Sequence, residues 1–173
     1  MIATDVFEIY TDLEKQGITI WIDGGWGVDA LLGEQTRPHQ DLDIVIQQRD
    51  VPGLRALLEV RGYKEIKIEE VRPWNFVLGD ESGREIDVHV IVLVSNGDGI
   101  YGPAENGQVY PSASLRGSGI IQGHTVKCIS AEWAVKFHSG YQLKEKDFAD
   151  VFALCKKFGL DLPEEFLPFV RSV

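Results

Sequence analysis

The sequence predicts an α+β fold, in which a mixed β-sheet is flanked by helices and followed by a short helical C-terminal part. Two observations lead to this prediction. Up to about residue 129, short runs of β-type residues alternate with amphipathic helical patterns. From residue 130 onward the pattern is helical only. We therefore expect residues 1–129 to form one domain, with residues 130–173 as a helical segment packed on it.

The first fifty residues predict two helices and two strands. Residues 4–16 form a helical pattern that has one apolar face and ends before Gly17. An apolar strand follows at residues 18–22, and a compact helical pattern at residues 26–32 comes after a pair of glycines. A polar connection then leads to a second strand, which begins at Asp41.

The rest of the chain continues this alternation. A helix starts at Val51-Pro52, since proline is tolerated in a first turn, and it ends at Gly62. Residues 95–118 are rich in Gly, Ser, Asn and Pro, and they predict a long loop with one short strand at Gln108–Tyr110. The remaining expected strands are residues 63–68, 75–78, 84–94, 119–121 and 124–129, and the remaining expected helices are residues 131–141, 144–158 and 162–170.

Composition and charge narrow the classes of function. The formal net charge is −10 and the Lys and Arg residues do not cluster, which argues against a nucleic-acid partner. No apolar run is long enough to span a membrane, and the first residues lack the pattern of a signal peptide. Cys128 and Cys155 form no metal-binding pattern. These features predict a cytoplasmic globular protein without a nucleic-acid or membrane partner.

The strand that begins at Asp41 carries two carboxylates. Side chains alternate faces along a strand, so Asp41 and Asp43 project from the same face, about 6–7 Å apart. Two such carboxylates repel each other unless a cation lies between them. Ligation by carboxylate oxygens suits Mg²⁺, which typically binds one or two carboxylates together with phosphate oxygens. The strand therefore predicts a Mg²⁺ site at Asp41 and Asp43.

Gly24 and Gly25 precede the second helix and predict a phosphate-binding turn. Glycine lets the backbone approach a ligand closely, and a helix that starts directly afterwards points its N–H groups at an anion. Alone, a glycine pair is more often a plain turn, and an Asp-x-Asp strand is more often an exposed edge. Their order along this chain places a phosphate cradle beside a metal-binding carboxylate pair, which is the arrangement that nucleotide chemistry requires.

The residues that carry a family resemblance are Gly24-Gly25-Trp26, followed by Arg37-x-His39-x-Asp41-x-Asp43. They resemble the nucleotidyltransferases of the DNA polymerase beta superfamily, and among these the small lincosamide and aminoglycoside 2″-nucleotidyltransferases. The resemblance implies a polymerase beta-like fold with residues 1–129 as the catalytic domain. It also implies a Mg²⁺-dependent transfer of a nucleoside monophosphate, with ATP as the expected donor, to a hydroxyl of such an antibiotic. The implied partners are one or two Mg²⁺ ions, the nucleoside triphosphate, the small-molecule acceptor and a second copy of the chain in a homodimer.

The resemblance further implies a third carboxylate on a central strand, and Asp87 fills that role within residues 84–94. A carboxylate in such a strand is unfavourable without a partner. Asp87 would share the metal site with Asp41 and Asp43 and would take the proton from the attacking hydroxyl. Glu85, two residues earlier on the same face, remains the alternative.

Two basic residues are candidates for nucleotide binding beside Gly24 and Gly25. Arg37 can contact a phosphate or brace its own loop. Lys146 lies just ahead of the Asp147-x-x-Asp150 helix, where the resemblance places a basic residue that reaches the triphosphate. The alternative for Lys146 is a solvated face of alternating charges.

Three residues are candidates for substrate binding. His89 shares a strand face with Asp87, so it can contact the acceptor, although an isolated histidine is more often a structural hydrogen-bonding group. Trp74 can stack on the base or on the substrate, or it can pack in the core. Tyr101 lies in the long expected loop, where aromatic side chains also pack locally.

Other functions remain open from the sequence alone. One is a toxin-like or housekeeping nucleotidyltransferase that modifies a tRNA end, a protein side chain or an unidentified metabolite. Another is a catalytically silent nucleotide-binding module, against which the three acids count. A metal-dependent hydrolase would leave Gly24 and Gly25 unexplained.

Overall fold

A central trio of strands organises the computed structural model, which describes residues 1–66, 72–103, 105 and 107–170. These strands are β1 (Ile20–Ile22), β2 (Asp41–Gln47) and β5 (Glu85–Leu93). β2 lies between the other two, antiparallel to β1 and parallel to β5. The two strands that carry the predicted acids are therefore direct neighbours, although more than 30 residues separate them in the chain.

The remaining strands extend this centre into one mixed sheet, which has nine strands within the described residues. These strands are β3 (Lys64–Ile66), β4 (Asn75–Gly79), β6 (Gly99–Tyr101), β7 (Gln108–Tyr110), β8 (Gly117–Ile121) and β9 (His124–Cys128). The order is β3-β4-β5-β2-β1-β9-β8, and β6 pairs with both β5 and β7. The prediction of a mixed sheet flanked by helices is confirmed.

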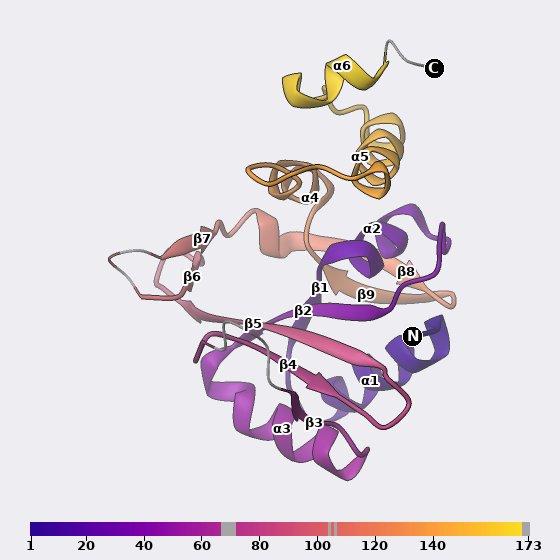
Figure 1. Ribbon diagram of the computed structural model, residues 1–173. Coiled ribbons are helices and arrows are strands. Elements are labelled where there is room, and N and C mark those ends of the chain that lie inside the picture. The colour runs from indigo at the N-terminus through magenta and orange to yellow at the C-terminus, as the bar shows by residue number, and fades with distance from the viewer. Residues whose placement is uncertain (67–71, 104, 106, 171–173) are drawn as a thin grey trace.

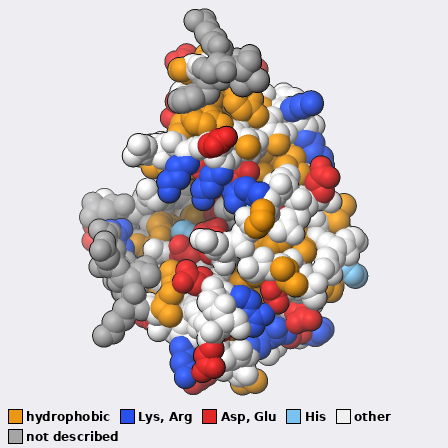
Figure 2. Space-filling view, turned by 45° about the vertical axis from the view of Figure 1, so that its right-hand side comes forward, with side chains coloured by type: hydrophobic (Ala, Val, Ile, Leu, Met, Phe, Trp, Pro, Cys, Tyr) orange, Lys and Arg blue, Asp and Glu red, His pale blue; other side chains and the backbone are white. Residues whose placement is uncertain are grey.

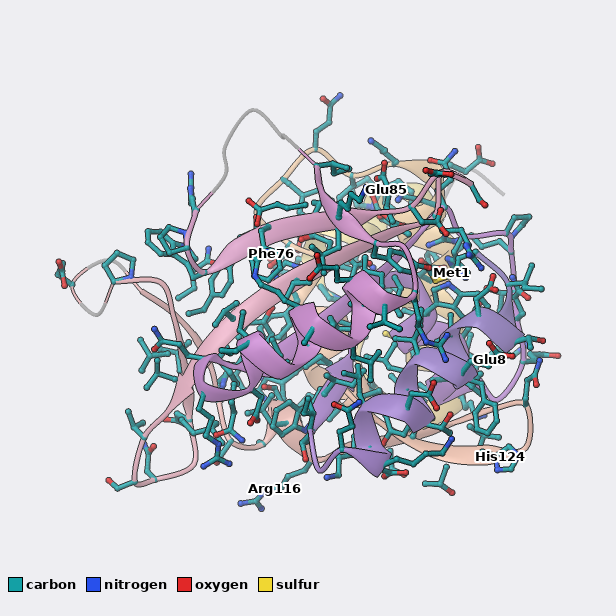
Figure 3. All side chains as sticks on the ribbon, turned by 90° about the horizontal axis from the view of Figure 1, so that it is seen from below. Met1, Glu8, Phe76, Glu85, Arg116 and His124 are labelled. Carbon is teal, nitrogen blue, oxygen red and sulfur yellow. The ribbon has the colours of Figure 1, made fainter. Side chains whose placement is uncertain are left out.

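Two helices cover one face of the sheet, α1 (Ala3–Lys15) and α3 (Val51–Val60), and they lie below it in Figure 1 and side by side in Figure 3. Both are amphipathic, and each buries one apolar stripe, as the helical spacing predicts. The stripes consist of Val6, Ile9, Tyr10 and Leu13 in α1 and of Leu54, Leu57 and Leu58 in α3.

The opposite face carries α2 (Gly24–Leu32), α4 (Ala131–Phe137) and α5 (Glu145–Phe158), which lie above the sheet in Figure 1. The chain ends in α6 (Leu167–Val170), and short 3₁₀ helices occupy Gln48–Asp50, Ser114–Arg116 and Glu164–Phe166. The helical character predicted for residues 130–170 is confirmed. The domain boundary at residue 129 stays a prediction. No helix in the described part of the chain is both long and apolar enough to cross a membrane.

Strand alternation divides β2 and β5 into an apolar face and a polar face. Ile44, Ile86 and Val88 are fully buried on the side of α1 and α3. Asp43, on the other face, is only half-buried. Burial of the apolar side holds the two strands in place, and the polar side is left free for chemistry.

Several predicted boundaries differ from the structure; the strands expected at residues 18–22 and 119–121, for example, are Ile20–Ile22 and Gly117–Ile121. The expected loop at residues 95–118 also contains β6, because Gly99–Tyr101 extends the sheet against the end of β5. The helix expected at residues 131–141 ends at Phe137, since the His138 ring bonds the Ala134 carbonyl at 2.7 Å and Gly140 takes a φ of 80°. The helix expected at residues 26–32 begins two residues earlier, because Asp23 caps it.

Two other differences concern short segments. The single helix expected at residues 162–170 is a 3₁₀ turn followed by the short α6. The strand expected at residues 63–68 is shorter in the structure, where β3 covers Lys64–Ile66, and residues 67 and 68 lie outside the described residues.

The buried face of β2 provides a test of the packing. We expect Ile44→Ala to lower the free energy of unfolding by about 2–5 kcal/mol, because Ile44 is fully buried and the substitution leaves a cavity. Ile120→Ala on β8 is the matched control, since Ile120 is 48% exposed, and it should change that free energy by less than about 1 kcal/mol. Urea unfolding followed by tryptophan fluorescence measures both, and equal losses would contradict this packing.

Candidate active site

The register between β2 and β5 brings two of the predicted acids together. Asp43 pairs with Asp87 across the parallel ladder, two residues along from the pairing of Asp41 with Glu85 at the starts of the two strands. Asp43 and Asp87 are half-buried, whereas Asp41 and Glu85 are exposed. Of the two candidates for the third carboxylate, Asp87 is therefore the one that faces Asp43.

His89 completes a compact cluster with these two acids. Its Nε2 lies 4.0 Å from Oδ1 of Asp43 and 3.9 Å from Oδ1 of Asp87. One ligand atom from each of the three residues falls within 4.8 Å of the others, so the cluster is compact enough to hold a metal ion. Asp41 lies outside this cluster of three, at the exposed start of β2.

The Asp87 carboxylate is held in place by its neighbour on β4. The side-chain amide of Asn75 donates a hydrogen bond to Oδ1 of Asp87 at 2.7 Å. Burial raises the pKa of Asp87 above its ordinary value, and the nearby Asp43 carboxylate raises it further, although His89 and the Asn75 hydrogen bond oppose both effects. A carboxylate with a raised pKa suits a proton acceptor.

For the pKa of His89, the effect of the neighbouring charges is larger than the effect of burial. Burial disfavours its charged form, but the carboxylates of Asp43, Asp87 and Asp23 outweigh burial and raise the pKa of His89. The carboxylates of the cluster therefore favour the protonated form of the imidazole relative to a free histidine. The sequence indicated that His89 shares a face with Asp87, and the structure confirms that placement.

A pocket of about 680 Å³ opens beside the cluster. Its volume lies within the range of roughly 300–1,000 Å³ that is typical of ligand sites. Figure 2 shows a hollow with a histidine and acidic side chains inside it and with Lys and Arg side chains above it. The lining residues are Asp23, Gly24, Gly27, Asp43, His89, Tyr101, Gln108, Val109, Tyr110, Ile129, Ala134, Lys136, Phe137, His138, Ser139 and Tyr141.

Asp23 is a pocket residue to which the sequence analysis assigned no role. It caps α2, since its Oδ1 accepts the Gly24 N–H at 2.8 Å, and its Oδ2 accepts a hydrogen bond from the Tyr110 hydroxyl at 3.3 Å. Burial is the main cause that raises the pKa of Asp23. The position of an aspartate directly before the glycine pair was the available signal, because aspartate is a preferred helix cap.

Gly24 is required by the close approach of Asp43 to the start of α2. A Cβ at Gly24 would overlap the Asp43 carboxylate, and the residue adopts a φ of 54°, which favours glycine. Gly24 thus permits a close approach to a protein side chain, while the predicted approach of the glycine pair to a phosphate stays a prediction. The partner of Gly24 in the structure is the predicted metal ligand itself, which places the N-terminus of α2 directly beside Asp43.

Gly25 lies against a polar network that links α2 to α5. His39 is hydrogen-bonded to Asp29 at 2.5 Å through Nε2 and to Arg37 at 3.0 Å through Nδ1. Because arginine can only donate, Nδ1 of His39 accepts and Nε2 carries the proton. Arg37 continues the chain as an ion pair with the buried Asp150 of α5 at 2.8 Å. Of the two predicted roles of Arg37, the structure shows the bracing of its loop.

The structure brings some of the other candidates into the pocket but not all of them. Tyr101 lines it, and its ring centroid lies 5.6 Å from that of His89. Trp74 is not among the lining residues and packs against Gly102, where an added Cβ would lie 3.2 Å from Nε1. Lys146 is exposed in the first turn of α5 and is also absent from the lining.

Lys136 of α4 is the basic residue that does line the pocket. Its Nζ bonds Glu132 at 2.7 Å and lies 4.4 Å from the ring centroid of Trp133. No role was predicted for Lys136, because residues 131–141 show only a helical pattern. Lys136 follows Ala134 by two residues and precedes Phe137 by one, so neither shares its helix face, and the local pattern carried no signal that Lys136 borders a cavity.

The contact between Gly24 and Asp43 can be tested against a second glycine. Gly24→Ala should lower the free energy of unfolding by about 1–3 kcal/mol more than Gly17→Ala, because the new methyl group displaces the carboxylate. Gly17 is a matched control, since its φ of 74° imposes the same kind of strain while nothing lies within 4 Å of an added Cβ. Chemical denaturation measures both, and similar losses in the two variants would argue against the close approach.

Comparison with known proteins places this geometry in a family. A family model described as aminoglycoside-2''-adenylyltransferase matches residues 5–154. A lincosamide resistance protein of Staphylococcus haemolyticus is 33% identical over 147 residues, which cover 85% of this chain and 90% of that protein. A 2''-aminoglycoside nucleotidyltransferase of Klebsiella pneumoniae is 30% identical over 132 residues, which cover 75% of this chain and 68% of that protein.

Solved structures agree with the sequence comparison. The lincomycin-bound lincosamide antibiotic adenylyltransferase LnuA has a TM-score of 0.78 and 32% identity, with 89% of this chain and 96% of that chain covered. ANT(2'')-Ia in complex with adenylyl-2''-tobramycin has a TM-score of 0.72, covers 91% of this chain and 89% of that chain, and at 23% identity supports the fold alone. The chain therefore belongs to the aminoglycoside-2''-adenylyltransferase family and is a nucleotidyltransferase with a polymerase beta-like fold.

Proposed function

We propose that this nucleotidyltransferase moves a nucleoside monophosphate, with ATP as the donor, onto a hydroxyl of a lincosamide-like small molecule. The observation that carries the proposal is the pair formed by Asp43 and Asp87, which face each other across β2 and β5 at a pocket of about 680 Å³. The lincomycin-bound relative, at 32% identity over 89% of this chain, supports the choice of acceptor.

The donor set fits a divalent metal ion. Asp43 and Asp87 are adjacent carboxylates on one face of the sheet, both are half-buried, and Asp43 lines the pocket. Such a pair is electrostatically unfavourable without a cation, and oxygen ligands suit Mg²⁺. We assign one or two Mg²⁺ ions to Asp41, Asp43 and Asp87. When bound, Mg²⁺ neutralises the negative charge of the phosphate oxygens.

The protein's own residues align the two substrates. The N-terminus of α2 lies next to Asp43, and its Gly25 N–H is our candidate donor to the phosphates, because the Gly24 N–H is bonded to Asp23. Lys136 lines the pocket, and its exposed ion pair with Glu132 can open so that the ammonium group reaches the triphosphate. Arg37 acts indirectly, because its guanidinium is engaged by Asp150.

Asp87 serves as the proton acceptor. The acceptor hydroxyl gives its proton to Asp87 as its oxygen forms a bond to the α-phosphorus, and the bond between that phosphorus and the bridging oxygen breaks to release pyrophosphate. Asn75 fixes the direction of the Asp87 carboxylate at 2.7 Å. Positioning of this kind supplies most of what phosphoryl-type transfer needs from a protein.

The walls of the pocket favour an acceptor with few positive charges. Tyr101, Tyr110, Phe137 and Tyr141 contribute aromatic surface, and Val109 adds an aliphatic side chain. Among the lining residues that the structure describes, Asp23 is the one carboxylate outside the metal-binding cluster. Aminoglycosides carry several ammonium groups, whereas a lincosamide carries a single amine and apolar substituents. One carboxylate beside these four aromatic side chains matches the lincosamide better.

An aminoglycoside is the second candidate acceptor. The formal net charge of −10 attracts multiply charged cations toward the protein, and the family model carries the name of that class of drug. The net charge attracts cations to the whole surface of the protein, whereas the side chains of the pocket walls contact the bound acceptor directly and so select it. We therefore rank the lincosamide first.

The proposal predicts a specific change in mass. Incubation with Mg²⁺, ATP and a panel of lincosamides and aminoglycosides should add one adenosine monophosphate to a lincosamide, as measured by mass spectrometry. Asp87→Asn should slow turnover by about 100-fold or more, because proton transfer to a positioned base contributes that much, while ATP binding is largely kept. Glu85→Gln is the matched control, and it should retain most of the activity because Glu85 is exposed and does not face Asp43.

If adenosine monophosphate is transferred to aminoglycosides alone, the acceptor is an aminoglycoside and not a lincosamide. If it is transferred to neither class of drug, the proposal that the acceptor is an antibiotic is wrong. Full activity in Asp87→Asn, or loss of activity in Glu85→Gln alone, would reverse the assignment of the third carboxylate.

The two lysines can be separated by nucleotide affinity. Lys136→Ala should raise the KM for ATP by about 10-fold or more, because a hydrogen bond to a charged group contributes about 1.5–3 kcal/mol. Lys146→Ala should leave that KM nearly unchanged, since Lys146 is exposed and outside the pocket lining. Steady-state kinetics with varied ATP measures both values. The reverse pattern would restore Lys146 as the residue that binds the triphosphate.

A further inference from the structure

We propose that Asp43, Asp87 and His89 form a mixed nitrogen–oxygen site for a transition-metal ion such as Mn²⁺, Co²⁺ or Zn²⁺. This site would bind these ions more tightly than Mg²⁺. The inference rests on the proposed function, because it concerns the ions bound at the same carboxylates. It differs from an all-carboxylate site in one respect, namely the imidazole nitrogen of His89.

The distances fit an ion between the three residues. The His89 Nε2 lies 4.0 Å from the nearest Asp43 oxygen and 3.9 Å from the nearest Asp87 oxygen. Metal bonds to imidazole nitrogen and carboxylate oxygen are each about 2.0–2.2 Å long, so any two ligand atoms of one ion stand at most about 4.2 Å apart, and closer when they are not opposite each other. Small side-chain rotations bring the atoms into contact with a shared ion without moving the strands.

The backbone that carries these ligands is rigid. Asp43 pairs with Asp87, and His89 lies two residues further along β5 on the same face. The intervening residues Ile44 and Val88 are fully buried on the other face, so neither strand can rotate. Ligands on paired strands with buried neighbours are positioned before the ion arrives, which favours binding.

Further contacts hold the ligand side chains themselves. Asn75 donates to the Asp87 carboxylate at 2.7 Å. The ring centroid of Tyr101 lies 5.6 Å from that of His89. Hydrogen bonds and packing around metal ligands set their orientation and raise affinity. The cluster therefore has the supporting contacts that a metal site requires.

The other histidines are committed elsewhere. The chain has four histidines. His39 uses one ring nitrogen for Asp29 and the other for Arg37, and His138 bonds the Ala134 carbonyl through Nδ1. His124 stacks on Phe7 at 4.3 Å between ring centroids and lies at the edge of the molecule in Figure 3. His89 is thus the histidine that directs a ring nitrogen at two carboxylates.

The ligand types decide which ion is preferred. Mg²⁺ binds oxygen ligands and usually retains several waters, so it gains little from an imidazole. Affinity at sites with nitrogen ligands rises from Mn²⁺ through Co²⁺, and Zn²⁺ is also well suited to imidazole. Asp41 precedes Asp43 by two residues on the same strand face and lies outside the mixed cluster, so we assign it to a separate ion position that shares Asp43. The mixed site would then be the second of two ion positions, and the first would remain an oxygen-only position for Mg²⁺.

Electron paramagnetic resonance on the full chain tests the proposal without turnover. Mn²⁺ is titrated into the nucleotide-free protein, the free-ion signal reports affinity, and pulsed measurements report coupling to ¹⁴N. We expect nitrogen coupling in the unmodified protein and displacement of Mn²⁺ by Mg²⁺ only at a large excess. His89→Gln should abolish the coupling and weaken Mn²⁺ binding by about 10-fold or more, since even supporting residues have effects of that size.

His124→Gln is the matched control, and it should preserve both the coupling and the affinity because His124 lies outside the cluster. Circular dichroism and melting curves establish that each variant is folded. Absence of nitrogen coupling in the unmodified protein, persistence of the coupling in His89→Gln, or equal affinity for Mg²⁺ and Mn²⁺ would overturn the proposal.

These outcomes are separate from those of the proposed function. Transfer of adenosine monophosphate with no nitrogen coupling would overturn the mixed site and leave the transfer intact. Nitrogen coupling without transfer to any acceptor would leave the metal site intact and contradict the transfer.

Discussion

The parallel pairing of β2 with β5 is the constraint on which the site depends. This pairing sets Asp43 opposite Asp87 and places His89 beside both carboxylates. Two neighbouring carboxylates repel each other, so the polar face opposes the arrangement. The stabilisation comes from the other face, where Ile44 and Val88 are fully buried. Burial of one face therefore holds the acids of the other face at a distance at which they can share a cation.

The second wall of the site comes from segments that are distant in the chain. The start of α2 abuts Asp43 through Gly24, and residues of α4 and of β7 close the pocket on the far side. The ion pair between Arg37 and Asp150 links the loop ahead of β2 to α5. The C-terminal helices thus contribute both to the pocket and to the position of the loop that leads into the acidic strand.

Much of the fold could be predicted because the deciding signals are local. The amphipathic spacing of α1 and α3, the long β-type run of β5 and the turn residues between the elements each depend on a few neighbouring side chains. The missed strand β6 is different. Gly99–Tyr101 is short, lies in a stretch rich in glycine, and becomes a strand only because the end of β5 offers it a partner. α4 ends at Phe137 and not at the expected residue 141, and this difference likewise depends on a side-chain contact, between His138 and the Ala134 carbonyl.

The sequence by itself determined the acid-bearing strand and the glycine pair, because alternation along a strand and the conformational freedom of glycine are properties of the local chain. Only the tertiary structure decided that Asp87, and not Glu85, faces Asp43, since this depends on the register between two strands. It also decided that Lys136 borders the pocket while Lys146 does not. Such choices rest on contacts between residues far apart in the chain, and local side-chain patterns carry no information about which distant segment becomes the neighbour.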